Sequence, residues 1–364
     1  MTTTSDAVAT TRPPRPVFHP LVVSKVERLC DDAAAVTFEV PAELRAAYAF
    51  DAGQSLTLRR FVDSGEQRRS YSICAAVGQS PRVGVREIPG GVFSRWLVRE
   101  VRPGDVIEVQ TPTGGFRADP AAGGRHLCIA AGSGITPMMS IATSVLTNPD
   151  SRVTLLYGNR STRSVMFAEE LADLKNRHPA RFELVHVMSR EPRDVELFSG
   201  RLEADRLRRL ITTLVPLDGL DHVWLCGPFG LIADGRQVLE ELGVPKERVH
   251  FELFYVDEPP PELHRPQPVV EGETSEVTVS LDGRTTTSAM PRGEAILDAA
   301  SRVRNDLPFA CKGGVCGTCR ALVTAGEVDM RRNYALDEDE VARGFVLTCQ
   351  THPVSDAVAV DYDA

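Results

Sequence analysis

The chain has 364 residues, of which 42% are hydrophobic and 25% charged, and a formal net charge of −9 at pH 7. This length predicts two or three domains with sizeable cores. The acidic charge argues against nucleic acid and anionic membrane surfaces as partners. No secretory leader opens the sequence, and glycine and proline interrupt its most apolar window, so we expect no membrane span and a cytoplasmic location.

Five segments follow one another along the chain. Residues 1–17, rich in Thr, Pro and Ala, predict a disordered tail. Short alternating strands between turn signals in 18–118, with a helix near 92–100, are typical of an antiparallel β-barrel. Residues 119–255 alternate strands and helices, which predicts an α/β domain with a parallel sheet and ligands at the carboxyl ends of its strands. A Pro-rich linker, 256–275, precedes a C-terminal domain, 276–364.

Two segments of the barrel are suited to an anionic ligand. In the strand Arg69-Ser70-Tyr71-Ser72, alternation puts Arg69 and Tyr71 on one face, and a guanidinium binds phosphate oxygens in a bidentate manner. An ordinary half-buried strand would explain this tetrapeptide alone equally well. The glycine-rich turn before Gly91-Val92-Phe93-Ser94 opens a helix, whose N–H groups and positive end face an anion.

In the α/β domain, the turn Gly132-x-Gly134-x-Thr136-Pro137 follows an apolar strand and precedes a helix. It departs from the dinucleotide fingerprint by ending in proline, which suits the start of a helix. Cys226-Gly227-Pro228 ends a later strand, and a buried cysteine followed by a turn is the plain alternative. The last predicted strand contains Phe251-Glu252-Leu253-Phe254.

Four cysteines in the C-terminal domain carry the most specific signal. Cys311, Cys316, Cys319 and Cys349 have the C-x4-C-x2-C…C spacing of a plant-type [2Fe–2S] ferredoxin. Glycines 313, 314 and 317 let the loop wrap closely and direct N–H groups at sulfur. A zinc site normally has two C-x2-C pairs, and disulfides are improbable in an intracellular chain. A strand over Phe345–Gln350 is expected to deliver the last ligand.

The remaining cysteines and one acidic run have simpler explanations. Cys30, Cys74 and Cys128 are predicted to be small buried hydrophobes. The acidic run from Asp337 to Glu340 either forms a docking patch or, more simply, begins a short helix whose first turn favours negative charge.

Taken in order, these motifs resemble the ferredoxin–NADP reductase family, here joined to a C-terminal ferredoxin with an α+β (β-grasp) fold. The resemblance implies that FAD is bound by Arg69, Ser70, Tyr71 and Ser72 and by Gly91, Val92, Phe93 and Ser94. It implies that the dinucleotide is bound by Gly132, Gly134, Thr136, Pro137, Cys226, Gly227 and Pro228, while Phe254 covers the flavin ring. Ser72, Cys226 and Glu252 would be the catalytic residues around the reacting rings, and the four cysteines would be the metal ligands.

The resemblance also implies an activity. Flavin accepts a hydride from a nicotinamide and passes on single electrons, which a [2Fe–2S] cluster can accept. The expected partner is the oxygenase component of a multicomponent monooxygenase. Segments such as Tyr157–Arg160 and Asn333–Leu336 resemble reductases that serve the epoxidation of phenylacetyl-CoA in phenylacetate catabolism. Reductases of steroid-ring (3-ketosteroid 9α-hydroxylase) or other ring-hydroxylating oxygenases are the alternative, and a pure electron carrier is a further one.

The loop after the second strand of the α/β domain bears on cofactor choice. An acidic residue there commonly binds the ribose 2′-hydroxyl of NADH and repels the 2′-phosphate of NADPH. This loop instead reads Arg160-Ser161-Thr162-Arg163, with no Asp or Glu before Glu169. The sequence therefore predicts NADPH, bound through Arg160, Ser161 and Arg163, with NADH possible. The alternative is a solvated loop whose arginines pair with Glu169 and Glu170.

Overall fold

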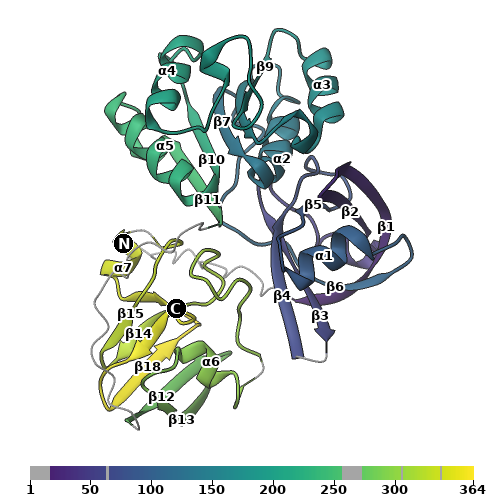
Figure 1. The fold of residues 1–364 in the computed structure, drawn as a ribbon. Helices are drawn as coiled ribbons and strands as arrows, with labels where there is room; N and C mark the ends of the chain where they lie inside the picture. Colours follow the sequence, from purple (N-terminus) through teal and green to yellow (C-terminus); the bar gives the residue numbers. More distant parts are fainter. Residues whose placement is uncertain (1–16, 63–64, 256–272, 305, 337) are drawn as a thin grey trace, which may run out of the picture.

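The computed structural model describes residues 17–62, 65–255, 273–304, 306–336 and 338–364. The predicted N-terminal tail, apart from residue 17, and most of the predicted linker therefore lie outside the described residues. Figure 1 shows three lobes: a barrel lobe (17–118), an α/β lobe (119–255) and a C-terminal lobe (273–364).

The barrel lobe is built on a single antiparallel sheet. Its order is β4-β3-β6-β1-β2-β5, and a bridge between Ile73 and Val83 joins the two edges. The strands are β1 (Phe18–Cys30), β2 (Ala33–Glu39), β3 (Ser55–Val62), β4 (Gly65–Ser72), β5 (Arg82–Arg86) and β6 (Val106–Gln110), with helix α1 (Val92–Arg99) and the 3-10 turn η1 (Ala42–Leu44). The predicted antiparallel barrel with one helix is confirmed.

The α/β lobe has a five-stranded parallel sheet in the order β11-β10-β7-β8-β9, as predicted. The strands are β7 (Arg125–Ala131), β8 (Arg152–Asn159), β9 (Phe182–Met188), β10 (His222–Pro228) and β11 (Val249–Tyr255). The helices are α2 (Ile135–Val145), α3 (Ala168–Arg177), α4 (Ala204–Leu214) and α5 (Phe229–Glu241), with 3-10 turns η2 (Gly132–Gly134), η3 (Thr162–Ser164), η4 (Glu196–Phe198) and η5 (Lys246–Arg248). The order places the ends of β7 and β10 beside each other, which is where the Gly132 turn and Cys226 lie.

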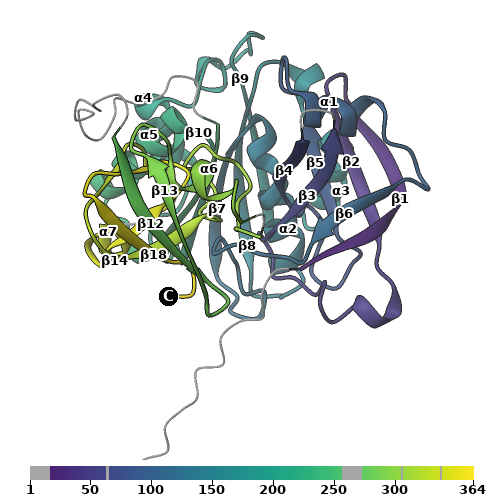
Figure 2. The same ribbon diagram turned by 90° about the horizontal axis from the view of Figure 1, so that it is seen from below.

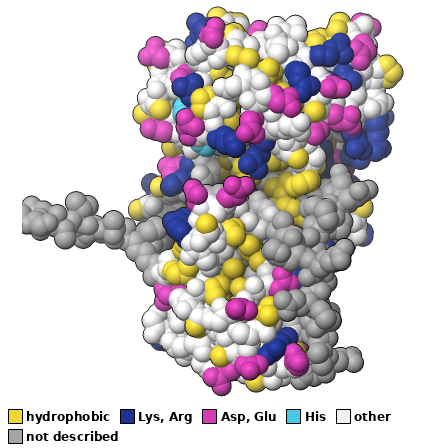
Figure 3. Space-filling view, turned by 90° about the vertical axis from the view of Figure 1, so that its left-hand side faces the viewer, with side chains coloured by type: hydrophobic (Ala, Val, Ile, Leu, Met, Phe, Trp, Pro, Cys, Tyr) yellow, Lys and Arg dark blue, Asp and Glu magenta, His cyan; other side chains and the backbone are white. Residues whose placement is uncertain are grey.

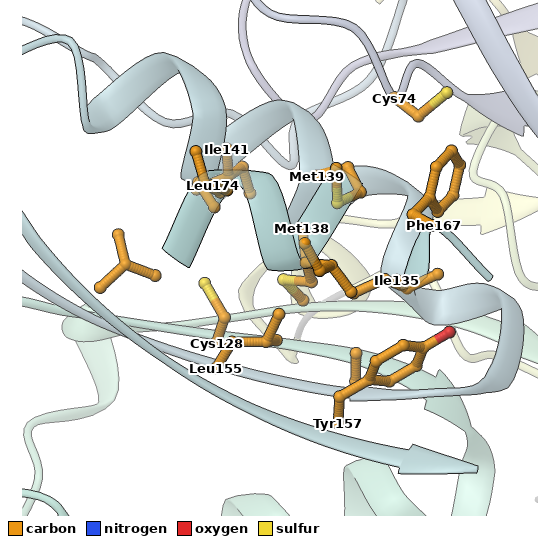
Figure 4. Packing of buried hydrophobic residues seen from close by; sticks show 14 of the residues in the cluster. Cys74, Cys128, Ile135, Met138, Met139, Ile141, Leu155, Tyr157, Phe167 and Leu174 are labelled. Carbon is orange, nitrogen blue, oxygen red and sulfur yellow. The ribbon is translucent and has the colours of Figure 1, made fainter. Parts of the chain in front are cut away.

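The barrel and α/β lobes share one hydrophobic core. Buried side chains from both lobes form a single cluster, in which Cys74 of the barrel lies near Met139 and Phe167 (Figure 4). A Cβ added to Gly84 of β5 would lie 2.6 Å from Thr136 Cγ2, so side chains of the α/β lobe pack against this strand as closely as a glycine permits. Arg82 also donates two hydrogen bonds of 2.8 Å across the joint to the carboxylate of Glu170. The relative position of these lobes is therefore fixed by packing as well as by charge.

The C-terminal lobe has its own core under a mixed sheet. The sheet is β12 (Thr274–Leu281), β13 (Arg284–Pro291), β14 (Arg320–Ala325), β16 (Phe345–Leu347) and β18 (Ala357–Asp361), beside the pair β15 (Val328–Met330) and β17 (Thr351–Pro353), with helices α6 (Ile296–Ala300) and α7 (Glu338–Ala342). The predicted strand over Phe345–Gln350 was too long: it ends at Leu347, and Cys349 lies in the following turn. A turn suits a ligand better than a strand because the chain must bend around the site. Asp337, the predicted helix cap, lies outside the described residues.

Few side chains of the described residues join the C-terminal lobe to the others. The Arg68 guanidinium lies 4.5 Å from the centre of the Phe309 ring, and it donates a 3.4 Å hydrogen bond to the Leu307 carbonyl. On the other side, the rings of Phe229 and Tyr334 meet edge to face at 5.8 Å, and Val315 packs against the α/β core. Figure 2 shows the C-terminal lobe beside the other two.

No helix within the described residues has the length and apolar character that crossing a bilayer would require.

Candidate functional site

Three residues far apart in sequence meet where the barrel and α/β lobes join. The hydroxyl of buried Ser72, at the end of β4, donates a 2.9 Å hydrogen bond to Glu252 Oε2 on β11. Cys226 on β10 is the direct strand partner of Glu252. Burial raises the pKa of Glu252 to about 7, although the bond from Ser72 opposes that rise. Burial, and then the nearby Glu252, raises the pKa of the Cys226 thiol, so this thiol stays protonated.

The other three residues of the β4 motif differ in whether another side chain already binds them. Tyr71 is partly buried, with its ring 6.2 Å from that of Phe93, and Arg69 beside it is exposed and donates to the Arg68 carbonyl. Ser70 instead shares a 2.9 Å hydrogen bond with the Thr57 hydroxyl on β3. Arg69 and Tyr71 therefore remain available to a ligand, whereas the Ser70 hydroxyl is already bonded to its neighbouring strand.

The turn before α1 can hold a diphosphate. A Cβ on Gly91 would lie 2.8 Å from Ser94 Oγ and 3.0 Å from the Ile88 carbonyl oxygen, so the turn is as tight as glycine allows. The Ser94 hydroxyl accepts a 3.0 Å bond from the Ile88 N–H, so it supports the turn from within. A cavity of about 320 Å³ lies beside this turn and the Val92 end of the helix. The Gly91 N–H is bonded to the Ile88 carbonyl, and the N–H groups of the first turn of α1 beside this cavity fit the diphosphate of FAD.

The same cavity contains basic residues that the sequence analysis missed. Arg60 and Arg95 line it, and the Arg60 guanidinium lies 4.2 Å from the centre of the Trp96 ring. Arg60 lies within β3 and Arg95 within α1, and neither position carries a sequence motif. Arg95 directly follows the Gly91–Ser94 motif, whereas only the folded barrel brings Arg60 to this turn.

The Gly132 turn comes as close to the end of β10 as a backbone can. A Cβ on Gly134 would lie 2.1 Å from the Cys226 carbonyl oxygen, and Gly132 has φ = +57°. The buried Tyr157 hydroxyl donates to the Gly132 carbonyl at 3.1 Å, and Thr136 Oγ1 donates to the Ser133 carbonyl at 3.0 Å. Gly134 is buried by this approach, and Gly132 leaves partly exposed backbone at the turn, which fits a pyrophosphate.

Some predicted residues of the two dinucleotide motifs do not reach that surface. Gly134, Thr136 and Pro137 are buried in the turn and the helix that follows it, and Cys226 and Gly227 are buried in β10, whereas Gly132 and Pro228 stay partly exposed. The cross-lobe residue Arg86 was missed by the sequence analysis, and its Nη1 would lie 3.2 Å from a Cβ on Gly132. Phe254 is partly buried against the shared core.

The loop after β8 is occupied differently from the prediction. Arg160 donates a 2.7 Å hydrogen bond to Asp32 of the barrel lobe, and Thr162 donates from its N–H and hydroxyl, at 2.8 and 2.6 Å, to Glu191. Ser161 forms a reciprocal capping box with Ser164. The alternative pairing of Arg160 with Glu169 or Glu170 was wrong, because the Glu170 carboxylate binds Arg82. Asp32 and Glu191 were missed since both are distant in sequence.

Cys30 also belongs to this region. It is half-buried, and its thiol donates a 3.2 Å hydrogen bond to Asp32 Oδ1, so the prediction of a plain buried hydrophobe was wrong for this residue. Cys74 and Cys128 are buried as predicted. Burial raises the pKa of the Cys128 thiol, which leaves it unreactive.

The four cysteines of the C-terminal lobe form two pairs. The thiols of Cys311 and Cys316 hydrogen-bond each other, and so do those of Cys319 and Cys349. No three Cys, His, Asp or Glu side chains of the described residues cluster closely enough to hold one metal ion. Two thiolates for each of two irons is the demand of a [2Fe–2S] cluster, so the paired arrangement fits it better than a single zinc.

Backbone groups of the same loop point at these sulfurs. Cys316 and the N–H groups of Gly313 and Val315 lower the pKa of Cys311, and the Gly313 N–H lies 3.3 Å from its sulfur. Positive φ angles at Gly314 (+79°) and Gly317 (+66°) are required to turn the loop. These backbone N–H groups therefore stabilise negative charge on the sulfurs, as binding of a cluster through thiolates requires.

Comparison with known proteins agrees with this division of the chain. Residues 20–118 match the oxidoreductase FAD-binding domain family, residues 128–237 the oxidoreductase NAD-binding domain family, and residues 279–354 the 2Fe-2S iron-sulfur cluster binding domain family. These matches and the site define an oxidoreductase that combines the three cofactor-binding domains in one chain.

Relatives match this chain over almost its whole length. The chain is 44% identical to a subunit of the 1,2-phenylacetyl-CoA epoxidase of Escherichia coli (95% of this chain, 98% of that protein). It is 33% identical to the ferredoxin reductase component of 3-ketosteroid-9-alpha-monooxygenase of Rhodococcus rhodochrous (94% and 96%). Solved phthalate dioxygenase reductase shares the fold with a TM-score of 0.61 at 24% identity (94% and 98%). The chain belongs to the family of FAD- and 2Fe-2S-containing reductase components of oxygenases.

Proposed function

We propose that the chain oxidises a nicotinamide dinucleotide at the joint of the barrel and α/β lobes and delivers single electrons to an oxygenase partner through its C-terminal lobe. The contact of Ser72 with Glu252, with Cys226 adjacent, is the observation that carries this proposal. Each lobe supplies part of the site, as a reaction between a flavin held by one and a nicotinamide held by the other requires. When bound, FAD accepts a hydride and releases its electrons singly, which a [2Fe–2S] cluster can take up.

The barrel lobe would hold FAD. Arg69 and the N–H groups at Gly91–Ser94 would bind its diphosphate, with Arg60 and Arg95 adding positive charge. Tyr71 would pack on the ring system from the same strand, and Phe254 would cover it from the α/β lobe. Ser72 would orient the reacting edge of the ring, because Glu252 fixes its hydroxyl.

The α/β lobe would hold the dinucleotide. Gly132 and Gly134 would admit its pyrophosphate, and Cys226 to Pro228 would border the nicotinamide. A hydride leaving the nicotinamide makes that ring positive, so an ionised Glu252 beside it stabilises the developing charge. A cysteine suits this border because its protonated thiol is small and uncharged.

In the C-terminal lobe, Cys311 and Cys316 would bind one iron and Cys319 and Cys349 the other. The paired thiols and the N–H groups directed at them support this assignment.

Eight free cysteines within the described residues also support a reducing compartment, and we propose the cytoplasm.

We further propose that the cofactor is NADPH. Arg163 is exposed, and Arg160 lies beside it, so both guanidinium groups could reach a 2′-phosphate if Arg160 leaves Asp32. Arg160→Ala is expected to lose about tenfold in kcat/KM with NADPH and little with NADH. A wild type that prefers NADH would contradict this part of the proposal.

Phenylacetyl-CoA ring epoxidation is the pathway that we propose, because the relative that carries this name is the more similar of the two compared above, at 44% against 33% identity. A steroid-ring monooxygenase is the second candidate.

Figure 3 shows Lys and Arg interspersed with Asp and Glu on the face that it displays, and this mixture offers no extended basic surface for nucleic acid.

Reconstitution tests the whole proposal. The purified chain should contain about one FAD and two irons, and NADPH should reduce cytochrome c through it. Adding the oxygenase components of a phenylacetyl-CoA epoxidase should give epoxide in proportion to NADPH used. Zinc in place of iron, or no reduction of cytochrome c, would contradict the reductase function, whereas failure with that oxygenase alone would contradict only the pathway.

A further inference from the structure

The loop that follows β8 lies between two carboxylates from different parts of the chain. Asp32, in the turn between β1 and β2 of the barrel lobe, accepts a 2.7 Å hydrogen bond from Arg160. Glu191, just after β9, accepts bonds of 2.8 and 2.6 Å from the N–H and hydroxyl of Thr162. Arg160 and Thr162, two of the polar residues that this loop could offer to a ligand, are therefore already bonded to acidic side chains.

These carboxylates lie at the edge of the sheet where a dinucleotide binds. Thr162 and Glu191 follow the carboxyl ends of the neighbouring parallel strands β8 and β9, and ligands of such sheets bind beyond those ends. Asp32 is tied to the Gly132 turn as well, because its carboxylate lies 3.2 Å from Arg86 Nε. Another nitrogen of the same guanidinium, Nη1, lies 3.2 Å from the position of a Cβ on Gly132. Asp32 thus lies between the turn suited to a pyrophosphate and the loop suited to a ribose.

Both carboxylates are held in the charged form. Burial opposes ionisation of Asp32, but Arg86, the Cys30 thiol and Arg160 together lower its pKa. Hydrogen bonds from Thr162 lower the pKa of Glu191. A charged carboxylate accepts a hydrogen bond from a ribose 2′-hydroxyl but repels a 2′-phosphate, which has no proton to give at neutral pH.

We propose that Asp32 and Glu191 are specificity-determining residues that oppose binding of a 2′-phosphate, Asp32 by holding Arg160 away from it and both by charge repulsion. The inference rests on the proposal that residues 160–163 receive the adenosine ribose. The balance between Arg160 and Arg163 on one side and these two carboxylates on the other then sets the preference between NADPH and NADH. A residue of the flavin-binding lobe would in this way help to select the nicotinamide cofactor.

Isosteric amides separate charge from structure. Asp32→Asn keeps an oxygen that can accept the bond from Arg160. Glu191→Gln keeps an oxygen for the Thr162 N–H, and its amide group can donate to the Thr162 hydroxyl. Both substitutions remove the negative charge. Asp31→Asn is the matched control, since this neighbouring carboxylate is exposed and makes no side-chain hydrogen bond or ion pair among the described residues. Each holoprotein is assayed for ferricyanide reduction with NADPH and with NADH. Inhibition by 2′,5′-ADP and by 5′-AMP, which differ only in the 2′-phosphate, is measured alongside.

Each amide variant should raise the ratio of kcat/KM for NADPH to that for NADH by about threefold or more. The change should lie in KM, and the inhibition constant of 2′,5′-ADP should fall while that of 5′-AMP stays unchanged. Asp31→Asn should leave the ratio of kcat/KM values and both inhibition constants at the wild-type values. If both amide variants leave the cofactor ratio unchanged, or lower kcat/KM for NADPH and NADH equally, the carboxylates only stabilise the conformation of the loop and the inference is wrong. The outcome is independent of which cofactor the wild type prefers, so it stands apart from the NADPH proposal.

Discussion

The two junctions of this protein are built in opposite ways. Where the barrel and α/β lobes meet, a single core crosses the boundary, and the Arg82–Glu170 and Arg160–Asp32 pairs reinforce it. The C-terminal lobe keeps a core of its own. Among the described residues, it meets its neighbours through side-chain contacts such as those of Phe309 with Arg68 of the barrel lobe and of Tyr334 with Phe229 of the α/β lobe.

The difference matches what each junction has to transfer. A hydride moves only between atoms that are nearly in contact, so the groups that hold the two rings must be fixed within a fraction of an ångström. A single electron can pass between centres that do not touch, so the junction that carries it tolerates a looser fit. The extensive joint therefore belongs to the two-electron step and the light contact to the one-electron step.

Removing one cysteine should have the largest effect and should divide the two functions. In Cys349→Ser, reduction of cytochrome c is expected to fall by about a hundredfold or more, because the cluster loses a ligand. Ferricyanide reduction should stay within about twofold of wild type, since its electrons need not pass through the C-terminal lobe. Cys128→Ala, at a buried cysteine outside the cluster, is the control and should change neither activity. Equal losses in both assays would contradict the separation of the two steps.

Glu252→Gln tests the joint itself. Hydride transfer, followed as flavin bleaching in a stopped-flow instrument, should slow by about 10- to 100-fold. The pKa of Glu252 is raised to about 7, so the wild-type rate should increase as pH rises through 7 and the carboxylate ionises, and the variant should lose this dependence. Glu247→Gln, on the exposed surface, is the control. A wild-type rate that falls as pH rises through 7 would assign the opposite protonation state to the reaction.

The same residue makes a prediction about stability. Because the folded pKa of Glu252 lies above its ordinary value of 4.5, the folded protein binds this proton more tightly than the unfolded chain. Wild type should therefore lose stability relative to Glu252→Gln as pH rises from 4.5 to 7, as measured by thermal unfolding at several pH values. A gap between the two melting temperatures that does not change with pH would show that Glu252 is not buried as a proton-binding group.

Matched core truncations compare the two junctions by stability. Met139→Ala removes a buried side chain of the shared core and Leu297→Ala one of the C-terminal core, and each should cost about 2–4 kcal/mol. Met139→Ala should lower the temperature of flavin release and leave that of cluster bleaching in place. Leu297→Ala should do the reverse. If either variant shifts both transitions equally, the C-terminal lobe is not an independent folding unit.

The smallest effects are expected at the light contact. Tyr334→Phe should be silent, and Tyr334→Ala and Arg68→Ala should each slow electron transfer from flavin to cluster by about fivefold or less, because one ring contact or cation–π contact is worth about 0.5–1 kcal/mol. Pre-steady-state absorbance of the cluster measures this step. A tenfold loss in either alanine variant would mean that this junction is as demanding as the other.

How far the sequence could predict the site depended on the distance between partners along the chain. The cysteine loop was predictable because three of its ligands and the turning glycines lie within nine residues, and spacing alone specifies the chemistry. Short strands between turn signals likewise predicted the barrel, and the alternation of strands and helices predicted the parallel sheet. Arg86, Asp32 and Glu191 were not predictable, because each reaches its place only through packing between strands that are distant in sequence. Cys349 was placed in a strand because the apolar run Phe345–Leu347 precedes it, and nothing in the sequence marks the end of that strand at Leu347.

The central claim is that electrons enter by the rigid joint and leave by the lightly attached lobe. Anaerobic stopped-flow mixing of the protein with one equivalent of NADPH, following flavin and cluster absorbance together, tests it most directly. The account predicts that flavin bleaches first and that the cluster is reduced in a later phase, which Glu252→Gln delays together with the first. In Cys349→Ser the first phase should keep its wild-type rate and the later one should disappear. Cluster reduction that precedes flavin bleaching, or a first phase slowed by the loss of Cys349, would contradict the account.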